Sequence, residues 1–384
     1  MNKKPVVLSV FGTRPDAIKM APLVKTIEKS DDFISKVCVT AQHRQMLDQV
    51  LKIFSINPDY DLDIMKDRQT LGRVTKTALE GLEDVLGKLK PDIVLVHGDT
   101  TTAFVASLAA FYAKIPVGHV EAGLRTYDKY FPFPEEMNRK LAGCIADLHF
   151  APTVTNYNNL VKEGVNPESI YITGNTVIDA LKVLVSKDYN FENDLLNNFD
   201  FTLKRVIAVT AHRRENLGKP LENICLALKE IVQKYPDVEI IYPVHLNPPV
   251  QETVRKILGN VPKVHLLDPI QVRDMHNLMS RSYLVLTDSG GLQEEAPSLG
   301  IPVLVLRNET ERPEAVKAGT VKVAGTDTQK IVKETELLLN DKAEYRRMAH
   351  SVNPYGDGHA SERILQAIRH WFGIIDKKPQ PFGV

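Results

Sequence analysis

Acidic side chains end or follow apolar runs in the first half of the chain, where they could carry out proton transfer. Asp99 ends the run IVLVHGD, Glu121 lies at the end of IPVGHVEAG, and Glu135 lies in the Pro-rich segment FPFPEEMNR. In the second half, His212 ends the run RVIAVTAH. Acid/base catalysis needs several titratable groups around one space, so these residues are candidates for it. Each residue alone is more often structural, as a helix cap or a hydrogen-bonded histidine, and it is their convergence that favours catalysis.

The segment LTDSGGLQEEAPSLG at 286–300 has the pattern of an anion-binding turn between a strand and a helix. Ser289 can cap the helix, and Gly290 and Gly291 would let an anion approach backbone N–H groups. Glu295 follows in the first turns, where a carboxylate could accept both hydroxyls of a ribose. No GK[ST] follows, so the segment is not a P-loop. It suits a nucleotide, although a capped helix with solvated acids remains the alternative.

Basic side chains that could neutralise a phosphate also occur just after apolar runs. Arg14 and Lys19 lie in FGTRPDAIK, and Arg312 lies in RNETERPEA. The first segment lacks the GxGxxG pattern of dinucleotide sites, which disfavours such a fold there. An ordinary loop before a helix started by proline would explain it equally well. Because neither an HExxH motif nor a close Cys/His cluster occurs in the sequence, we expect no metal site.

These residues must be positioned by an alternation of short apolar runs with longer stretches of helical period. Helices are predicted at 15–30, 71–89, 101–113 and 361–372, with apolar residues at steps of three and four in 71–89. The predicted strands are 6–11, 36–41, 93–99, 115–123, 205–212, 238–245, 263–268, 283–288 and 301–306. The alternation predicts an α/β fold with parallel sheets that helices cover on both faces.

The order of elements in the first half is repeated in the second, which predicts two Rossmann-like domains. We place an N-terminal domain at 1–174 and a C-terminal domain at 175–360. Residues 361–384 would form a helix that crosses back to the first domain, followed by a tail. Ligands of such sheets bind beyond the carboxyl ends of the strands, so we expect a central cleft faced by both domains.

Composition excludes several classes of function. The 384 residues contain 48 Lys plus Arg and 48 Asp plus Glu, so the formal net charge is zero. We therefore expect no nucleic-acid partner, because a neutral chain lacks general affinity for a phosphate backbone. The apolar stretches are too short to span a bilayer, so we expect no membrane partner either. Cys38, Cys144 and Cys225 lack metal-type spacing and are interpreted as core residues of a reduced, cytoplasmic protein.

The motifs together resemble the bacterial non-hydrolysing UDP-N-acetylglucosamine 2-epimerases. The resemblance covers about residues 6 to 372 and rests on GTRPDAIKMAPL, TAQHRQML, HGDTTT, HVEAGLRT, FPEEMNR, APT, GNTVIDAL, TAHRRENLG, LTDSGGLQEEAPSLG and RPEAVKAGT. It implies a glycosyltransferase B type fold and interconversion of UDP-GlcNAc and UDP-ManNAc. The implied route is elimination of UDP to 2-acetamidoglucal followed by re-addition. It further implies a homodimer that needs no NAD or other cofactor and supplies ManNAc for cell-surface polymers.

The resemblance also assigns roles to individual residues. Asp99, Glu121 and Glu135 match the acid/base positions, without showing which residue takes the proton, and His212 matches a histidine near the diphosphate. The positions that match UDP-binding residues are Arg14, Lys19, Met275, Ser289, Gly290, Gly291, Glu295 and Arg312. Met275 departs from the pattern, because relatives often carry Phe there near the uracil. A thioether can still cover a ring.

Many members of that family are activated by UDP-GlcNAc at a second site. The segments TAQHRQML and DRQTL match those that line it. The candidate residues are Gln42, His43, Gln45, Arg68, Gln69, Arg213 and His245. Judged from its local sequence alone, the segment at Gln42 is a polar loop that opens a helix.

Alternative functions stay open at this point. A UDP-sugar-dependent glycosyltransferase of the same fold would bind the same nucleotide sugar but would need an acceptor. A hydrolysing 2-epimerase would release free ManNAc. A non-catalytic nucleotide-sugar sensor should lack the acid/base residues, all of which are present in this sequence.

Overall fold

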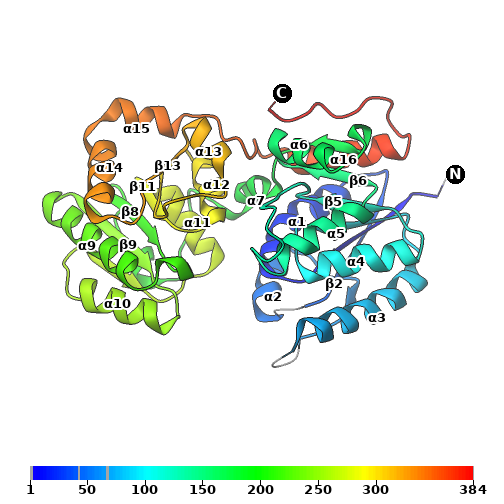
Figure 1. Ribbon diagram of the computed structural model, residues 1–384, viewed down its shortest axis with the longest axis horizontal. Coiled ribbons are helices and arrows are strands. Elements are labelled where there is room, and N and C mark those ends of the chain that lie inside the picture. The colour runs from blue at the N-terminus through cyan, green and yellow to red at the C-terminus, as the bar shows by residue number, and fades with distance from the viewer. Residues whose placement is uncertain (1–2, 42–43, 66–68, 384) are drawn as a thin grey trace. The chain divides into compact units, whose positions relative to one another are not determined.

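The computed structural model describes residues 3–41, 44–65 and 69–383, with the side chain of Gln45 left outside the description. The chain folds into two compact units, Met1–Val183 together with Tyr355–Val384, and Leu184–Pro354. It passes between them at 183–184 and 354–355, whereas the sequence pattern predicts boundaries at 174–175 and 360–361. Figure 1 shows the elements of each unit.

The first unit is built on a parallel sheet with the strand order β3-β2-β1-β4-β5-β6-β7. The strands are β1 (Val6–Phe11), β2 (Ile34–Val39), β3 (Tyr60–Asp61), β4 (Ile93–His97), β5 (Val117–Val120), β6 (Leu148–Ala151) and β7 (Ile170–Ile172). Strands β1 and β4 pair directly, with Val7 opposite Ile93, so the strand order reverses between them. Ligands of open parallel sheets bind beyond the carboxyl ends of the strands at such a reversal.

Helices α1 to α6 of the first unit connect successive strands, whereas α7 and α16 follow the last strand of its sheet and the second unit, respectively. They are α1 (Arg14–Glu28), α2 (Arg44–Ile53), α3 (Leu71–Leu89), α4 (Thr101–Tyr112), α5 (Glu135–Ile145), α6 (Val154–Lys162), α7 (Thr176–Leu184) and α16 (Ala360–Trp371). Helix α3 shows how apolar residues at helical spacing form a buried face. Val74, Ala78 and Leu82 recur every four residues and are buried, and the Thr70 hydroxyl accepts a hydrogen bond from the Arg73 N–H at the N-terminus.

The second unit has the strand order β10-β9-β8-β11-β12-β13. Its strands are β8 (Arg205–Thr210), β9 (Val238–Pro243), β10 (Val264–Leu267), β11 (Leu284–Thr287), β12 (Val303–Val305) and β13 (Val321–Val323). Its helices are α8 (Asp194–Asn197), α9 (Lys219–Lys234), α10 (Pro248–Leu258), α11 (Val272–Arg281), α12 (Gly290–Ser298), α13 (Pro313–Ala318), α14 (Thr328–Asn340) and α15 (Lys342–Ala349). The order reverses between β8 and β11, where Val209 lies opposite Leu286.

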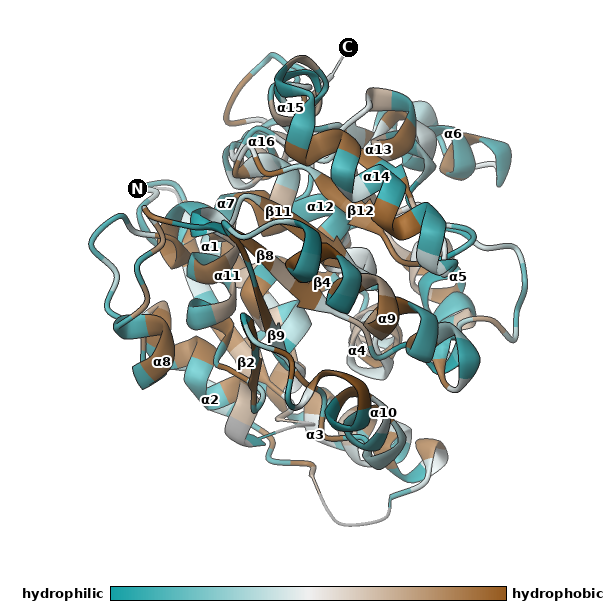
Figure 2. Ribbon diagram, turned by 90° about the vertical axis from the view of Figure 1, so that its left-hand side faces the viewer, coloured by the Kyte–Doolittle hydropathy of each residue, from teal (hydrophilic) through white to brown (hydrophobic). Residues whose placement is uncertain are grey.

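Buried strands hold each unit together. In Figure 2 strand β8 is brown, whereas helix α9 carries both brown and teal residues. This agrees with burial, since Val206, Ile207, Ala208 and Val209 are each at most 1% exposed. A strand covered on both faces reads as a continuous apolar run, which is why β8 is recognisable in the sequence.

The C-terminal helix α16 belongs to the first unit and packs against α1. Asp179 of α7 accepts hydrogen bonds from the N–H groups of Ala360 and Ser361, at 3.1 and 2.7 Å, and so caps the start of α16. Near its other end, Arg369 pairs with Asp32 at 2.7 Å. The returning chain segment is thus bound to the first unit at both ends of the helix.

The predicted α/β class is confirmed, because both sheets are parallel and alternate with helices. The short strands β3, β6, β7 and β13 are absent from the prediction, since two to four residues carry little periodic signal. The interpretation of all three cysteines as core residues is wrong for Cys144, which is exposed. It lies on α5, and the buried face of that helix is formed by other positions.

Candidate functional site

The strand-order reversal of the first unit places a tight turn after β1. A Cβ atom on Gly12 would lie 2.0 Å from the Thr40 hydroxyl oxygen, so only glycine fits there. The carboxylate of Asp16, in the first turn of α1, accepts hydrogen bonds from the Gly12 and Thr13 N–H groups at 3.1 and 3.2 Å. Helix α1 begins at Arg14, which the turn therefore places at the carboxyl end of β1.

Glu121 is held in a strained conformation directly after β5. Its φ of +62° lies in the left-handed region, which costs a non-glycine residue about 1 kcal/mol or more. One carboxylate oxygen forms an ion pair with Lys19 and accepts a hydrogen bond from the Asn175 amide at 2.8 Å. The other oxygen lies 3.6 Å from Nε2 of His97. Lys19, predicted to bind phosphate, therefore contacts an acid/base candidate in this structure.

The imidazole of His97 provides a neutral neighbour for Glu121. Burial lowers the pKa of His97 to about 4, although the charge of Glu121 acts in the opposite direction. At neutral pH the ring is therefore uncharged, and Glu121 has Lys19 as its charged partner among these neighbours.

Asp99 follows β4 and pairs with the buried guanidinium of Arg139 on α5. Burial raises the pKa of Asp99 even though Arg139 opposes that shift. Arg139 also contacts Glu136 at 3.3 Å, and the Asn138 amide donates to the Asp99 carbonyl at 3.0 Å. Helix α5 thus fixes both the carboxylate and the backbone of Asp99.

Glu135 is the first residue of α5 and is half-buried. It lies one helical turn before Arg139, so both residues occupy the same face of the helix. The next residue, Glu136, has a different task. It is fully buried and accepts hydrogen bonds from the Thr126 and Tyr127 N–H groups at 3.1 and 3.0 Å, which makes it a structural support of the preceding loop.

In the second unit, the strand-order reversal brings together the ends of β8 and β11. The carboxylate of Asp288, which is 0% exposed, accepts hydrogen bonds from the His212 and Arg213 N–H groups at 2.7 and 2.8 Å. The Asn216 amide donates to the same oxygen at 3.0 Å. One carboxylate therefore anchors the whole turn that carries His212.

His212 is a half-exposed side chain in a mixed electrostatic environment. Its ring stacks on that of His245, with centroids 5.1 Å apart and an interplanar angle of 12°. Burial lowers the pKa of His212, His245 and Arg213 lower it further, and only Asp288 opposes the shift. The imidazole is therefore neutral at pH 7 in the absence of a bound anion.

The segment Ser289–Gly291, here termed the phosphate turn, opens helix α12. A Cβ atom on Gly290 would lie 3.8 Å from a guanidinium nitrogen of Arg213 and 3.9 Å from one of Arg312. Arg312 is fixed by an ion pair with Glu294, which is 5% exposed. Two guanidinium groups and a helix N-terminus thus meet at one point, an arrangement suited to binding an anion.

Ser289 occupies the N-cap position of α12, as predicted. Its hydroxyl, however, makes no cap hydrogen bond within the part of the chain that the structure describes. The turn is held instead by the Ser289 N–H, which donates to the Thr287 hydroxyl at 2.9 Å.

The predicted ribose-binding residue Glu295 contacts a histidine of the neighbouring helix. Nε2 of His276 on α11 lies 2.9 Å from one carboxylate oxygen of Glu295, and Nδ1 of His276 lies 2.8 Å from the Val272 carbonyl. The other carboxylate oxygen of Glu295 points back toward Gly291, 3.3 Å from where a Cβ would stand. Met275 precedes His276 on α11 and is half-buried.

The residues predicted for a second ligand site divide into two groups. Gln42, His43 and Arg68 lie outside the described residues, as does the side chain of Gln45. Gln69 is described, and its amide donates to the Ile64 carbonyl at 2.9 Å. Arg213 and His245 lie beside Gly290 and His212, so the structure brings them next to predicted UDP-binding and catalytic residues.

Several residues of these clusters lie inside the predicted motifs, but sequence reasoning assigns them no role. Arg139 belongs to FPEEMNR, Asn175 to GNTVIDAL, and Asp288 to LTDSGG. Their positions within shared motifs are the signal that could have found them. Their partners, however, come from other segments, so only the fold reveals the contacts.

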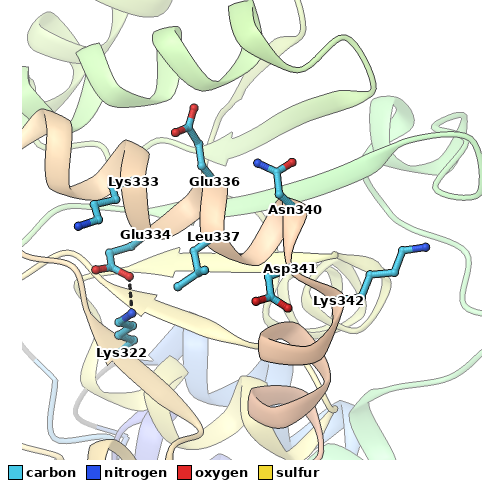
Figure 3. A pocket seen from close by; sticks show the side chains of 8 residues that line it. All are labelled: Lys322, Lys333, Glu334, Glu336, Leu337, Asn340, Asp341 and Lys342. Carbon is cyan, nitrogen blue, oxygen red and sulfur yellow. Dashed lines mark ion pairs between the residues drawn. The ribbon is translucent and has the colours of Figure 1, made fainter.

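Features outside these two clusters give no further candidate site in the part of the chain that the structure describes. Within residues 3–41, 44–65 and 69–383, no group of His, Cys, Asp or Glu has the geometry to hold a metal ion. No helix in these ranges is long and apolar enough to cross a membrane. Figure 3 shows a surface hollow along α14 that is lined by charged residues, with Lys322 paired to Glu334 at 2.5 Å. None of the predicted site residues lines it.

Comparison with known proteins places this arrangement in a family. The family model described as UDP-N-acetylglucosamine 2-epimerase matches residues 25–369. The chain is 57% identical to the UDP-N-acetylglucosamine 2-epimerase of Escherichia coli strain K12, over 95% of this chain and 98% of that protein. It is 55% identical to that of Bacillus subtilis, over 99% of both.

A solved structure points to the same family. The Neisseria meningitidis UDP-GlcNAc 2-epimerase, solved with bound UDP-GlcNAc, matches with a TM-score of 0.85 and 51% identity, over 94% of this chain and 99% of that one. The family model covers most of the chain, and the relatives match nearly its whole length. The chain therefore belongs to the UDP-N-acetylglucosamine 2-epimerase family.

Proposed function

We propose that this chain catalyses the reversible epimerisation of UDP-GlcNAc at C2 to give UDP-ManNAc, as a non-hydrolysing 2-epimerase. The observation that carries the proposal is the N. meningitidis relative, 51% identical over nearly the same length, which was solved with UDP-GlcNAc bound. The phosphate turn flanked by Arg213 and Arg312 supports it independently, because a diphosphate would suit that geometry.

The chemistry follows from the position of the proton. The C2 hydrogen of the sugar has no adjacent carbonyl, so direct deprotonation is too costly. Breaking the C1–O bond develops positive charge at C1 and acidifies C2–H. A base removes that proton, and the electron pair of the C2–H bond forms the C1=C2 bond of 2-acetamidoglucal. UDP leaves with the electrons of the C1–O bond. Re-addition of UDP with protonation of the opposite face of C2 gives the epimer.

The first unit would supply the acid/base groups. Glu121 and Asp99 are each held by a cation, Lys19 and Arg139, which fixes the carboxylates in place. The raised pKa of Asp99 brings it closer to the working pH of a general acid. Glu135 completes the set. Proton removal and return need groups on both faces of C2, and several carboxylates near one substrate would titrate together.

The second unit would bind UDP. The phosphate turn and the guanidinium of Arg312 would stabilise the charge that grows on the diphosphate as the C1–O bond breaks. The guanidinium of Arg14, in the first unit, would help to neutralise this charge. Glu295 would hold the ribose hydroxyls, and Met275 would lie near the uracil. His212 would donate a hydrogen bond or proton to the leaving group.

The reaction is redox-neutral, since a proton and UDP leave the sugar and a proton and UDP are added back, with no net transfer of electrons. It therefore requires neither NAD nor another redox cofactor. We further propose that the enzyme works as a cytoplasmic homodimer and supplies ManNAc units for cell-surface polysaccharide.

Activation by UDP-GlcNAc at a second site is part of the proposal. Arg213 lies beside the phosphate turn, and His245 stacks on His212, so a ligand on these residues would act directly on the catalytic groups. Sigmoidal dependence of the rate on UDP-GlcNAc concentration is expected. Hyperbolic rates that Arg213→Ala and Gln42→Ala leave unchanged would remove the second site.

Incubation of the protein with UDP-GlcNAc alone, followed by proton NMR, tests the function. Appearance of UDP-ManNAc supports it, and Asp99→Asn and His212→Asn should abolish most turnover with unchanged circular dichroism. Free ManNAc would indicate a hydrolysing enzyme instead. Absence of any reaction until a sugar acceptor is added would indicate a glycosyltransferase.

A further inference from the structure

One oxygen of the buried Asp288 carboxylate is left without a donor. Oδ2 accepts the hydrogen bonds from His212, Arg213 and Asn216, whereas Oδ1 accepts none from any residue that the structure describes. Burial removes water from such an oxygen, and without a hydrogen-bond donor nothing replaces the lost hydration. The environment of Oδ1 therefore favours an approaching N–H group.

The imidazole of His212 is the side chain that could donate an N–H group to Oδ1 of Asp288. Its Nδ1 lies 3.8 Å from Oδ1 of Asp288, which is too long for a hydrogen bond. A ring movement of about 1 Å would close the gap, and catalytic hydrogen bonds are often long before substrate binds. The backbone of His212 is held on Oδ2, and its ring stacks on that of His245, which limits the freedom of the side chain to turn elsewhere.

We propose that Asp288 is a positioning residue that selects the Nδ1–H tautomer of His212 and directs Nε2 toward the leaving diphosphate. The inference rests on the proposed function for its consequence in catalysis, but not for the contact itself. A carboxylate only accepts hydrogen bonds, so the ring nitrogen that faces it must carry the hydrogen. Nε2 is then the nitrogen that gains and gives up the exchangeable proton.

The charged and titratable groups around His212 have opposite effects on the pKa of its imidazole. His245 and Arg213 disfavour the imidazolium form, and Asp288 favours it. Nδ1 of His245 accepts the Asn247 N–H at 3.1 Å, so a ring hydrogen of His245 lies on Nε2. Asp288 is thus the group that lets His212 take up a proton once an anionic diphosphate is also present.

Substitution Asp288→Asn separates anchoring from tautomer selection. The amide oxygen can still accept the bonds from the His212 and Arg213 N–H groups, while the amide NH2 then faces Nδ1. The ring should switch to the Nε2–H tautomer, and its pKa should fall further. We expect kcat to fall on the order of 100-fold, as losses of groups that orient a catalytic histidine do. The dissociation constant of UDP should change by less than about 3-fold.

The experiment is proton–nitrogen NMR on histidine-labelled full-length protein, with His212 assigned from His212→Asn. Asp274→Asn is the matched control, because Asp274 is also buried in the second unit and accepts backbone N–H groups, those of Glu192 and Asn193. Wild type and control should show Nδ1–H, and Asp288→Asn should show Nε2–H.

An Nε2–H tautomer in the wild type would overturn the inference, even if Asp288→Asn failed to fold. So would an unchanged tautomer and kcat in a folded Asp288→Asn protein. If the tautomer switched but the wild type did not epimerise UDP-GlcNAc, the proposed function would fail and the positioning role would stand.

Discussion

Asp16 is expected to lower the stability of the protein at neutral pH, so Asp16→Asn should be stabilising. The side chain is 3% exposed, and burial raises its pKa from an ordinary 3.8 to about 6. At 1.36 kcal/mol per pKa unit, this difference of about 2 corresponds to about 3 kcal/mol. Ionisation of Asp16 therefore lowers the free energy of unfolding by at most about 3 kcal/mol.

The sign follows from which state binds the proton more tightly. The folded protein holds the Asp16 proton up to about pH 6, whereas the unfolded chain releases it near pH 3.8. The stability contribution is therefore complete below pH 3.8, falls as pH rises to about 6, and is constant above. Asn at this position has no such dependence, and its amide oxygen can keep the bonds from the Gly12 and Thr13 N–H groups.

Urea unfolding of wild type and Asp16→Asn at pH 4 and pH 7.5 measures the effect. Relative to wild type, the variant should gain up to about 3 kcal/mol between the two pH values. Asp16→Ala is the control, since it also removes the charge but loses the acceptor for the turn, which costs about 1 kcal/mol. A difference between Asp16→Asn and wild type that is the same at both pH values, or that shrinks toward pH 7.5, would contradict a raised pKa of Asp16 in the folded protein.

Further predictions concern the groups that hold the site. Glu294→Gln removes the charged partner from the Glu294–Arg312 ion pair and should weaken UDP binding about 10-fold in calorimetry, because the guanidinium is then held less firmly beside the phosphate turn; unchanged affinity would exclude this role. Asn175→Ala removes a donor from Glu121 and should lower kcat about 10-fold in the NMR assay, with UDP affinity intact. Gly123→Ala should destabilise by at least about 3 kcal/mol in urea unfolding, because φ is +91° and its Cβ would lie 2.3 Å from a carbonyl oxygen of α6; a smaller loss would mean that the turn can relax.

The ends of the long strands were predictable from sequence because buried parallel strands are continuous apolar runs. Asp99, Glu121, His212 and Ser289 each follow such a run, and the structure places each just beyond a strand end. Once the strand order is known, their neighbourhood follows, since these strands lie at or next to the reversal in each sheet.

The contacts that fix these residues were not predictable, because they join distant segments. Lys19 and Glu121 are 102 residues apart, and Asp99 and Arg139 are 40 apart. No local pattern encodes such pairs, whose partners depend on how α1 and α5 pack on the sheet. The same holds for Asp288, which reads as a strand end in the sequence and proves to anchor the turn carrying His212.

In the proposed reaction, the C2 proton exchanges with solvent while the nucleotide sugar is epimerised. Proton NMR of UDP-GlcNAc incubated with the protein in D2O measures both at once. We expect loss of the C2 proton signal and deuterium at C2 in the UDP-ManNAc that forms, with no added cofactor or acceptor. UDP-ManNAc that retains its C2 hydrogen, or UDP-GlcNAc that stays unchanged at full enzyme concentration, would contradict it.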